Sequence, residues 1–418
     1  MILKDNKLLT KYLSLGWVSC IGDALYYIAL MTYAAYLDNP ALGILIITIS
    51  TLFPTAVDVI LGALADSIKE KTLLIIKTGI FRGFIFLIIA FIISQSVSLT
   101  GLILIAILNA ISGTAGTFSA RLKSPFLRLI VHEDQLEKAI GINTGIRESL
   151  DVIAGFVGVI ILGIIGIYYL AYFNALLFFI VSMGFAHIQK EMKLYEKTLT
   201  PPEFNGIKSL IIHIVTCVKK LYKIIPLRKF LLVGAALNGI LGACLASFLI
   251  SLTQNPEMFV SNFELSTSIA KGVLFVFGLA GAIIGPNLKK IGTTFILSST
   301  LIVTIGYKLA IAVHLPWIAI AFICIGIFFA TFFSIRLSSI LMQSVPPEIL
   351  GTMGSAFNIF LAVLPIPLTI FLNSLASISL PLYGILSAIL CALLIVFILF
   401  SKLDKLDLKN SFLAYVQN

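Results

Sequence analysis

The sequence predicts an all-α membrane protein with twelve transmembrane helices in two pseudo-symmetric six-helix bundles. Its composition is the first reason: 59% of the 418 residues are hydrophobic and 11% are charged, against about 25% charged residues in soluble domains. The mean hydropathy is +1.09. Because backbone polar groups in hydrocarbon must bond to one another, only helices or a closed barrel can span a bilayer. Barrel strands alternate apolar and polar residues, whereas runs such as 83–93 and 388–400 have no polar side chain except a cysteine.

An internal repeat is the second reason for this fold class. The pattern A-x-x-F-S-x-R-L-x-S begins at Ala115 and again at Ala330, a shift of 215 positions that is close to half the chain. The same shift aligns Glu133 with Glu348. Two halves built on one plan, both rich in apolar segments, are typical of secondary transporters made from structural repeats.

The individual spans are predicted from apolar segments of about 20 residues. In the first half they cover 9–37, 41–64, 72–95, 99–129, 137–166 and 168–188; in the second half they cover 228–252, 265–288, 293–313, 316–344, 349–374 and 379–400. The fourth and tenth spans are about 30 residues long, so we expect them to tilt or to extend beyond the hydrocarbon.

The distribution of Lys and Arg predicts the orientation in the membrane. Basic residues follow the even-numbered spans and occupy both ends of the chain. The connections after the odd-numbered spans contain no Lys or Arg; they are 38–40, 94–98, 166–168, 253–261 and 314–315. We therefore expect a multi-pass protein of the plasma membrane with both termini in the cytoplasm.

The chain is predicted to divide into four parts. They are an N-terminal bundle (1–188), a linker (189–227), a C-terminal bundle (228–400) and a cytoplasmic tail (401–418). Within the linker, apolar residues recur at helical spacing from Ile207 to Ile225, with lysines among them. This pattern is typical of an amphipathic helix in the inner membrane interface. Two roles are open for this helix: a tether between the bundles or a regulatory site.

Several classes of function are disfavoured by the residue pattern. The net charge of +10 comes from basic residues spread over short connections, which argues against a nucleic-acid partner. The five cysteines are far apart and have no His partner at ligand spacing, so we predict no metal site. The chain has no Walker loop, no H-E-x-x-H motif and no soluble stretch long enough to fold alone. We expect neither an enzyme nor a cofactor.

A motif after the second span carries a family resemblance. Residues 62–71 read G-A-L-A-D-S-I-K-E-K and resemble the G-x-L-A-D-R-x-G-R-K loop of the major facilitator superfamily. Gly62, Asp66 and Lys71 match that pattern, whereas three positions between Asp66 and Lys71 depart from it. The resemblance implies the major facilitator fold, with two bundles that alternate access to a central cavity.

The motif also has a physical interpretation. Gly62 permits close contact between helices. The Asp66 carboxylate can then lie near the N-terminus of a helix from the other half, one that starts near residues 348–351. The resemblance to the major facilitator superfamily implies that such a contact would hold the cytoplasmic gate shut in one state and break in the other.

Two further patterns resemble the multidrug and macrolide exporter branch of this superfamily. They are S-x-x-G-D, which ends at Asp23 in the first span, and V-P-P-E-x-x-G, which ends at Gly351 after the tenth span. This resemblance implies efflux of an amphipathic or cationic small molecule by an antiporter that admits protons.

Asp23 is the candidate coupling residue. A charged side chain at a helix centre costs roughly 2.5 to 3.5 kcal/mol on insertion scales, so it is retained for a reason. In the resemblance family the first span lines the central cavity. A carboxylate there can hold either a proton or a cationic substrate, so proton release can be exchanged for substrate binding. The alternative is a structural partner for a buried donor, and the sequence does not separate the two.

A charged cluster in the fifth span comprises Arg147, Glu148 and Asp151. Arg147 and Asp151 are four residues apart and can pair on one helix face. One interpretation is an ion-pair network that closes the inner gate with Arg121 or Arg336. The other makes Glu148 or Asp151 the second carboxylate of the proton path.

Other polar residues within spans have more ordinary expected roles. Arg82 in the third span is expected to bond inward to a neighbour, and Lys271 and Lys308 are expected to snorkel to the outer interface. Three asparagines on the expected cavity helices can bind substrate or join helices: Asn109, Asn238 and Asn358.

The predicted function is proton-coupled export of an amphipathic or cationic small molecule. The expected partners are that substrate, protons and the lipid bilayer, and we expect a monomer. Transport of a lipid-like metabolite or a divalent metal on the same scaffold is an alternative. A non-transporting membrane receptor or scaffold is the alternative from another class.

Overall fold

The computed structural model describes residues 5–35, 37–38, 40–95, 97–202, 206–223, 225–258, 260, 263–288 and 291–401. Within these residues the chain forms α-helices with short 3-10 and π segments and contains no strand. The predicted all-α class is therefore confirmed. The predicted tail, 401–418, lies outside the described residues except for Ser401.

Two compact units make up the chain. Unit 1 comprises Met1–Leu136, Ile146–Cys217 and Val345–Ser355, and unit 2 comprises Glu137–Gly145, Val218–Ser344 and Ala356–Asn418.

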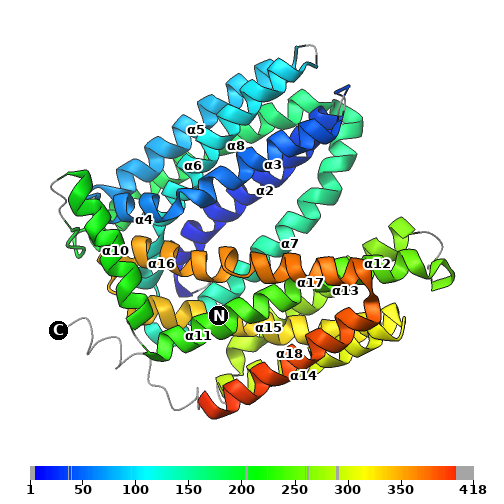
Figure 1. The fold of residues 1–418 in the computed structure, drawn as a ribbon. Helices are drawn as coiled ribbons and strands as arrows, with labels where there is room; N and C mark the ends of the chain where they lie inside the picture. The colour runs from blue at the N-terminus through cyan, green and yellow to red at the C-terminus, as the bar shows by residue number, and fades with distance from the viewer. Residues whose placement is uncertain are drawn as a thin grey trace. The chain divides into compact units, whose positions relative to one another are not determined.

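Unit 1 contains seven whole helices and most of an eighth, α7. They are α2 (Lys7–Ala35), α3 (Pro40–Ala56), α4 (Asp58–Ser67), α5 (Lys71–Ile93), α6 (Leu99–Ile130), most of α7 (Glu133–Ile165), α8 (Ile167–His187) and α9 (Gln189–Glu196). Helix α5 packs against α6 and α8, α2 packs against α8, and α3 and α4 pack against α6 (Figure 1). The aromatic core joins Phe86 to Tyr26 and Phe178, with ring centroids 4.6 and 5.2 Å apart.

Unit 2 is a second helical bundle. Its helices are α11 (Ile225–Gly242), α12 (Cys244–Gln254), α13 (Phe263–Ile284), α14 (Thr293–Ala312), α15 (Pro316–Ser344), α17 (Ile366–Ile378) and α18 (Leu380–Ser401), with short turns η1 (Pro256–Met258) and η2 (Gly285–Asn287). Helix α14 packs against α15 and α18, α13 packs against α15, and α11 packs against α17 (Figure 1).

Each unit also contains part of a helix that is shared with the other unit. Residues 137–145 of α7 belong to unit 2, whereas Val345–Ser355, which includes η3 (Pro347–Ile349) and the start of α16 (Leu350–Asn358), belongs to unit 1. The repeat shift of 215 positions places 345–355 on 130–140, close to the first of these segments. The two shared helices therefore lie at similar positions of the internal repeat.

Several long helices are interrupted. The segments Ile49–Ala56 and Asp58–Ser67 meet at a bend of 48°, one turn after Pro54, which has no backbone N–H to donate. Helices α11 and α12 are separated by Ala243, and a π segment, η4 (Ile359–Val363), joins α16 to α17. Discontinuous helices are where transporters place polar backbone groups within a membrane.

Ten helices in the described part of the chain are long and apolar enough to cross a membrane, and the bent pair of α3 and α4 would make eleven. The predicted fifth span, 137–166, coincides with α7 up to Ile165, and α7 is not among these candidates. In the linker, α10 (Ile207–Lys223) occupies the stretch where the apolar periodicity predicts a helix.

Candidate functional site

A polar cavity of about 420 Å³ lies within unit 1. Helices α2, α3, α5 and α6 supply most of its walls. Three of its lining residues are charged, namely Asp23, Arg82 and Arg147. Small residues of α6, among them Gly113 and Gly116, leave the space open.

The Asp23 carboxylate pairs with Arg82 at the wall of this cavity. The Arg82 guanidinium donates to Asp23 Oδ1 at 3.0 Å and to Ser112 Oγ at 3.2 Å, and its central carbon lies 4.0 Å from the Phe178 ring centroid. The Arg82 side chain is 12% exposed, whereas that of Asp23 is 47% exposed. Arg82 is therefore held by several neighbours, while Asp23 can meet another partner from the cavity.

The other predicted cavity residues are distributed unevenly. Asn109 lines the same cavity and donates to Ser50 Oγ at 3.0 Å. Arg147 also lines it, but Glu148 and Asp151 do not, although both are exposed. Among the described residues, no ion pair joins Arg147 to Asp151. The pairing expected from their spacing is thus not present in this structure.

A second cluster in unit 1 is centred on Asp66, which is 2% exposed. Its carboxylate accepts hydrogen bonds from the backbone N–H groups of Gly351 and Thr352 at 2.8 and 2.7 Å, and from the Thr352 hydroxyl at 2.6 Å. The first N–H groups of a helix have no partner within it, and the helix dipole favours an anion there. Asp66 therefore caps the start of α16, at the place where the sequence predicts such a contact.

Gly62 and Lys71 support this cap from either side. A Cβ atom on Gly62 would lie 2.5 Å from both the Gly351 carbonyl oxygen and Ser355 Oγ, so only glycine permits this approach. Lys71 is 1% exposed and donates to the carbonyl oxygen of Asp66 at 3.1 Å and to that of Ala65. It thereby satisfies the last carbonyls of α4.

Arg121 forms a buried bidentate pair with Asp58. Its Nε donates to Asp58 Oδ1 at 2.8 Å and its Nη2 donates to Oδ2, while Ser355 Oγ donates to Oδ1 at 3.2 Å. The sequence analysis missed Asp58. The criterion that selected Asp23, an acid inside an apolar span, would also have selected it.

Arg336, at the repeat position of Arg121, also pairs with a carboxylate, in unit 2. Its Nε donates to Glu137 Oε1 at 3.4 Å, and the guanidinium also donates to the carbonyls of Leu288 and Ile291. The acids that hold Arg121 and Arg336 are thus Asp58 and Glu137. In this structure they are not Glu148 and Asp151, which the predicted gate network would use.

Two more predicted residues lie in unit 2. The Asn238 amide donates to the Leu361 carbonyl at 2.9 Å, inside the π segment where helical bonding is interrupted. Asn358 is exposed and is the last residue of α16.

The prediction that Lys308 snorkels to the interface is wrong. Lys308 has 0% exposure, and its ammonium donates to the Tyr383 hydroxyl and to the Ile240 carbonyl at 3.3 Å. The break between α11 and α12 leaves carbonyls that need donors, and Tyr383 and Tyr307 also donate to carbonyls at this break. These acceptors stabilise the ammonium inside the bundle.

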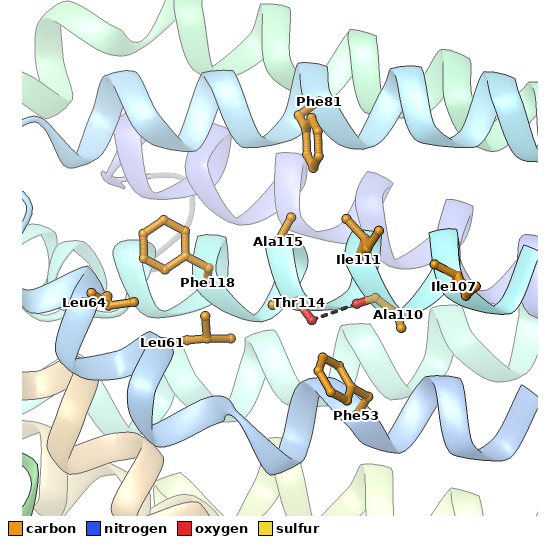
Figure 2. A pocket seen from close by; sticks show the side chains of 10 residues that line it. All are labelled: Phe53, Leu61, Leu64, Phe81, Ile107, Ala110, Ile111, Thr114, Ala115 and Phe118. Carbon is orange, nitrogen blue, oxygen red and sulfur yellow. Dashed lines mark hydrogen bonds between the residues drawn. The ribbon is translucent and has the colours of Figure 1, made fainter. Parts of the chain in front are cut away.

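An apolar groove of about 570 Å³ lies on other faces of α3, α4, α5 and α6. Figure 2 shows Phe81 on α5 and Phe53 and Leu61 on the bent pair pointing toward α6. The Thr114 hydroxyl in this groove donates to its own helix, at the Ala110 carbonyl. The groove therefore offers no free donor to a polar substrate.

Comparison with known proteins identifies the family. A sequence model of the Major Facilitator Superfamily matches residues 12–368. The chain belongs to the major facilitator superfamily. It is therefore a multi-pass membrane transporter, and the predicted fold is confirmed at that level. No curated protein sequence matches the chain.

Solved structures similar to this superfamily member share its fold at low identity. A bacterial homologue of the iron transporter ferroportin, in its outward-facing state, has a TM-score of 0.67 at 14% identity, covering 98% of this chain and 100% of the homologue. The E. coli fucose:proton symporter FucP has a TM-score of 0.64 at 14% identity, with 94% and 98% covered. The human organic anion transporter MFSD10 has a TM-score of 0.67 at 9% identity, with 93% and 99% covered.

Within the described residues of this transporter, no group of three or more His, Cys, Asp and Glu side chains is placed to hold a metal ion.

Proposed function

We propose that this superfamily member is a proton-coupled antiporter that exports an amphipathic or cationic small molecule. In this proposal it belongs to the multidrug and macrolide exporter branch and works as a monomer in the plasma membrane, with both termini in the cytoplasm. Each proton that enters across a potential of 100 mV releases about 2.3 kcal/mol for export.

The Asp23–Arg82 pair is the observation that carries this proposal. A proton on Asp23 removes its charge and weakens the pair, and a cationic substrate would bind the same carboxylate. The half-exposed side chain of Asp23 can be reached from the cavity. Because proton and cation compete for one group, binding of one releases the other, which is the requirement for antiport.

The remaining predicted residues have supporting roles in this proposal. Glu148 and Asp151 are accessory carboxylates of the proton path. Side-chain amides hydrogen-bond the substrate; they are Asn109, Asn238 and Asn358.

The gate is proposed to be the Asp66 cap on α16. Opening it would break the three hydrogen bonds that the carboxylate accepts from Gly351 and Thr352. Gly62 and Lys71 hold the capped geometry. Three arginines are proposed to take part in gating as well: Arg121, Arg147 and Arg336.

The charge of the cavity favours a second candidate, cotransport of a proton with an anionic small molecule. Arg82 and Arg147 face one carboxylate there, and the hydroxyl of the buried Tyr26, on the cavity wall, has no hydrogen-bond partner among the described residues. An anion on Arg82 would favour a protonated Asp23, so proton and substrate would move in the same direction.

The direction of proton coupling separates the two candidates. Purified protein in proteoliposomes, with the membrane potential clamped, is given ethidium as a cationic probe and p-aminohippurate as an anionic probe. Antiport predicts ethidium accumulation in vesicles with an acidic interior, whereas cotransport predicts p-aminohippurate accumulation when the exterior is acidic. The Asp23→Asn variant should lose either accumulation, and Glu70→Gln, an exposed acid outside the cavity, should retain it. Flux no faster than in protein-free vesicles for both probes would contradict both candidates.

A further inference from the structure

We propose that α10 binds the surface of an anionic lipid leaflet and that this binding stabilises the Asp66 cap through His213. The proposal concerns regulation and goes beyond the transport function proposed above. It rests on two sides of α10, one exposed and one in contact with the residues at the start of α16.

The exposed face of α10 combines apolar and basic side chains. Ile211 is 53% exposed, Ile212 is 55% exposed and Val215 is 42% exposed. Lys208 and Lys219 are exposed on the same face, at helical positions close to these three. A helix with exposed apolar side chains beside lysines is suited to an interface between hydrocarbon and anionic headgroups.

The position of α10 in the chain identifies the bilayer as the occupant of this face. Helix α8 is long and apolar enough to cross a membrane, as is Arg228–Leu252, which begins shortly after α10. Helix α10 therefore lies, along the chain, between two segments that can enter the membrane. The positive charges select anionic lipids over neutral ones, because the negative surface potential of such a leaflet attracts lysines close to the membrane.

The opposite side of α10 contacts the residue that Asp66 binds. His213 Nε2 lies 3.4 Å from Thr352 Oγ1 and 3.5 Å from the sulfur of Cys217, which is 3% exposed. The Thr352 hydroxyl donates its single hydrogen to Asp66. It can therefore only accept from His213. His213, Thr352 and Asp66 form one hydrogen-bonded chain.

This chain gives the lipid a way to shift the gate equilibrium. A ligand shifts a two-state equilibrium only by its difference in affinity for the two states. While His213 contacts Thr352, α10 is held in one orientation. Its exposed apolar and basic side chains can then bind the leaflet together. Lipid binding should then favour the state in which Asp66 caps α16. This shift of the equilibrium should be lost when His213 is replaced.

The first experiment measures lipid contact of α10. A nitroxide is placed on Ile212→Cys of the full chain in a Cys20→Ser background, since the other four cysteines are buried. In vesicles of phosphatidylcholine with phosphatidylglycerol, we expect the label to be more accessible to oxygen and less accessible to a polar relaxant than in phosphatidylcholine alone. The double variant Lys208→Gln, Lys219→Gln should lose this difference, and a label on exposed Thr198 should show none. Equal water accessibility in both lipids would overturn the proposal.

The second experiment measures transmission to the cap without any substrate. Hydrogen exchange of the Gly351 and Thr352 amides reports the Asp66 contact directly. Anionic vesicles should slow this exchange by about fivefold or more, the lower end of usual coupling between sites. His213→Ala should abolish that effect while leaving the label depth unchanged. Two results would overturn the proposal. One is a hydrogen-exchange rate that is the same in anionic and neutral vesicles for the unsubstituted protein; the other is an undiminished slowing by anionic vesicles in His213→Ala. Neither readout requires transport, so failure here is distinct from failure of the proposed function.

Discussion

The carboxylate of Asp66 accepts hydrogen bonds from both the backbone amide and the hydroxyl of Thr352, at 2.7 and 2.6 Å. The two residues lie 286 positions apart. A residue at the end of the bent second span therefore caps a helix from the second half of the sequence, within unit 1. The structure of this cap leads to the first two predictions.

Replacing Asp66 by Asn should weaken the cap. The amide oxygen is a poorer acceptor than a carboxylate, and its NH2 group would face N–H donors. We expect a loss of about 1 to 3 kcal/mol in the free energy of unfolding, together with faster hydrogen exchange of Gly351 and Thr352. Thermal unfolding in detergent tests this, with Asp134→Asn at an exposed position as the control. Equal melting of the two variants would show that the cap contributes nothing to stability.

Substituting Gly62 by Ala tests the close approach of α4 to α16. The added Cβ would lie 2.5 Å from the Gly351 carbonyl oxygen, so the two backbones must separate. The matched control is Gly16→Ala, because a Cβ there meets nothing within 4 Å. We expect Gly62→Ala to destabilise the protein by about 1 to 3 kcal/mol and to lower transport, while Gly16→Ala leaves both unchanged or raises stability. The same melting temperature for both variants would contradict the contact.

The Arg121–Asp58 pair should behave as one unit. The two side chains are 15% and 7% exposed, so removing one partner leaves a buried charge unpaired. Asp58→Asn or Arg121→Gln alone should cost about 3 to 5 kcal/mol. The double variant should lose clearly less than the sum of the two. Unfolding free energies that simply add would mean that the pair is not coupled.

Lys308→Met tests the support of the α11–α12 break in unit 2. Methionine keeps most of the length of the side chain but cannot donate to Tyr383 or to the Ile240 carbonyl. We expect a loss of about 1 to 3 kcal/mol from the unsatisfied acceptors. Lys271→Met, at an exposed position, should have the same melting temperature as the unsubstituted protein. If Lys308→Met were more stable than the unsubstituted protein, the desolvation of the buried ammonium would cost more free energy than its hydrogen bonds contribute.

The sequence was informative about features that can be seen in a short segment of the chain or in the internal repeat. Apolar length predicted the all-α membrane class, and the Gly62 to Lys71 motif located a contact that depends only on a small residue and a nearby carboxylate. The duplicated arginines Arg121 and Arg336 marked equivalent positions that both turned out to pair with acids. The all-α class and the repeated arginines need no knowledge of which helices are neighbours.

Apart from the contact of Asp66 with the start of α16, which the motif predicted, pairing between distant spans was not available from the sequence. Asp23 meets Arg82 across 59 positions, and Arg121 meets Asp58 across 63. Nothing in the local sequence distinguishes these partners from the acids of the fifth span. Lys308 was misjudged for the same reason, because its acceptors, the Ile240 carbonyl near a helix break and the Tyr383 hydroxyl, belong to other helices.

The most direct test of the central proposal is the exchange of protons for substrate by Asp23→Asn in proteoliposomes. We predict that accumulation of ethidium driven by a pH gradient is lost in this variant. Exchange of ethidium between equal concentrations on the two sides should also be slower, because the cation loses the carboxylate that it shares with the proton. Accumulation by Asp23→Asn at the rate of the unsubstituted protein would contradict the proposed role of Asp23.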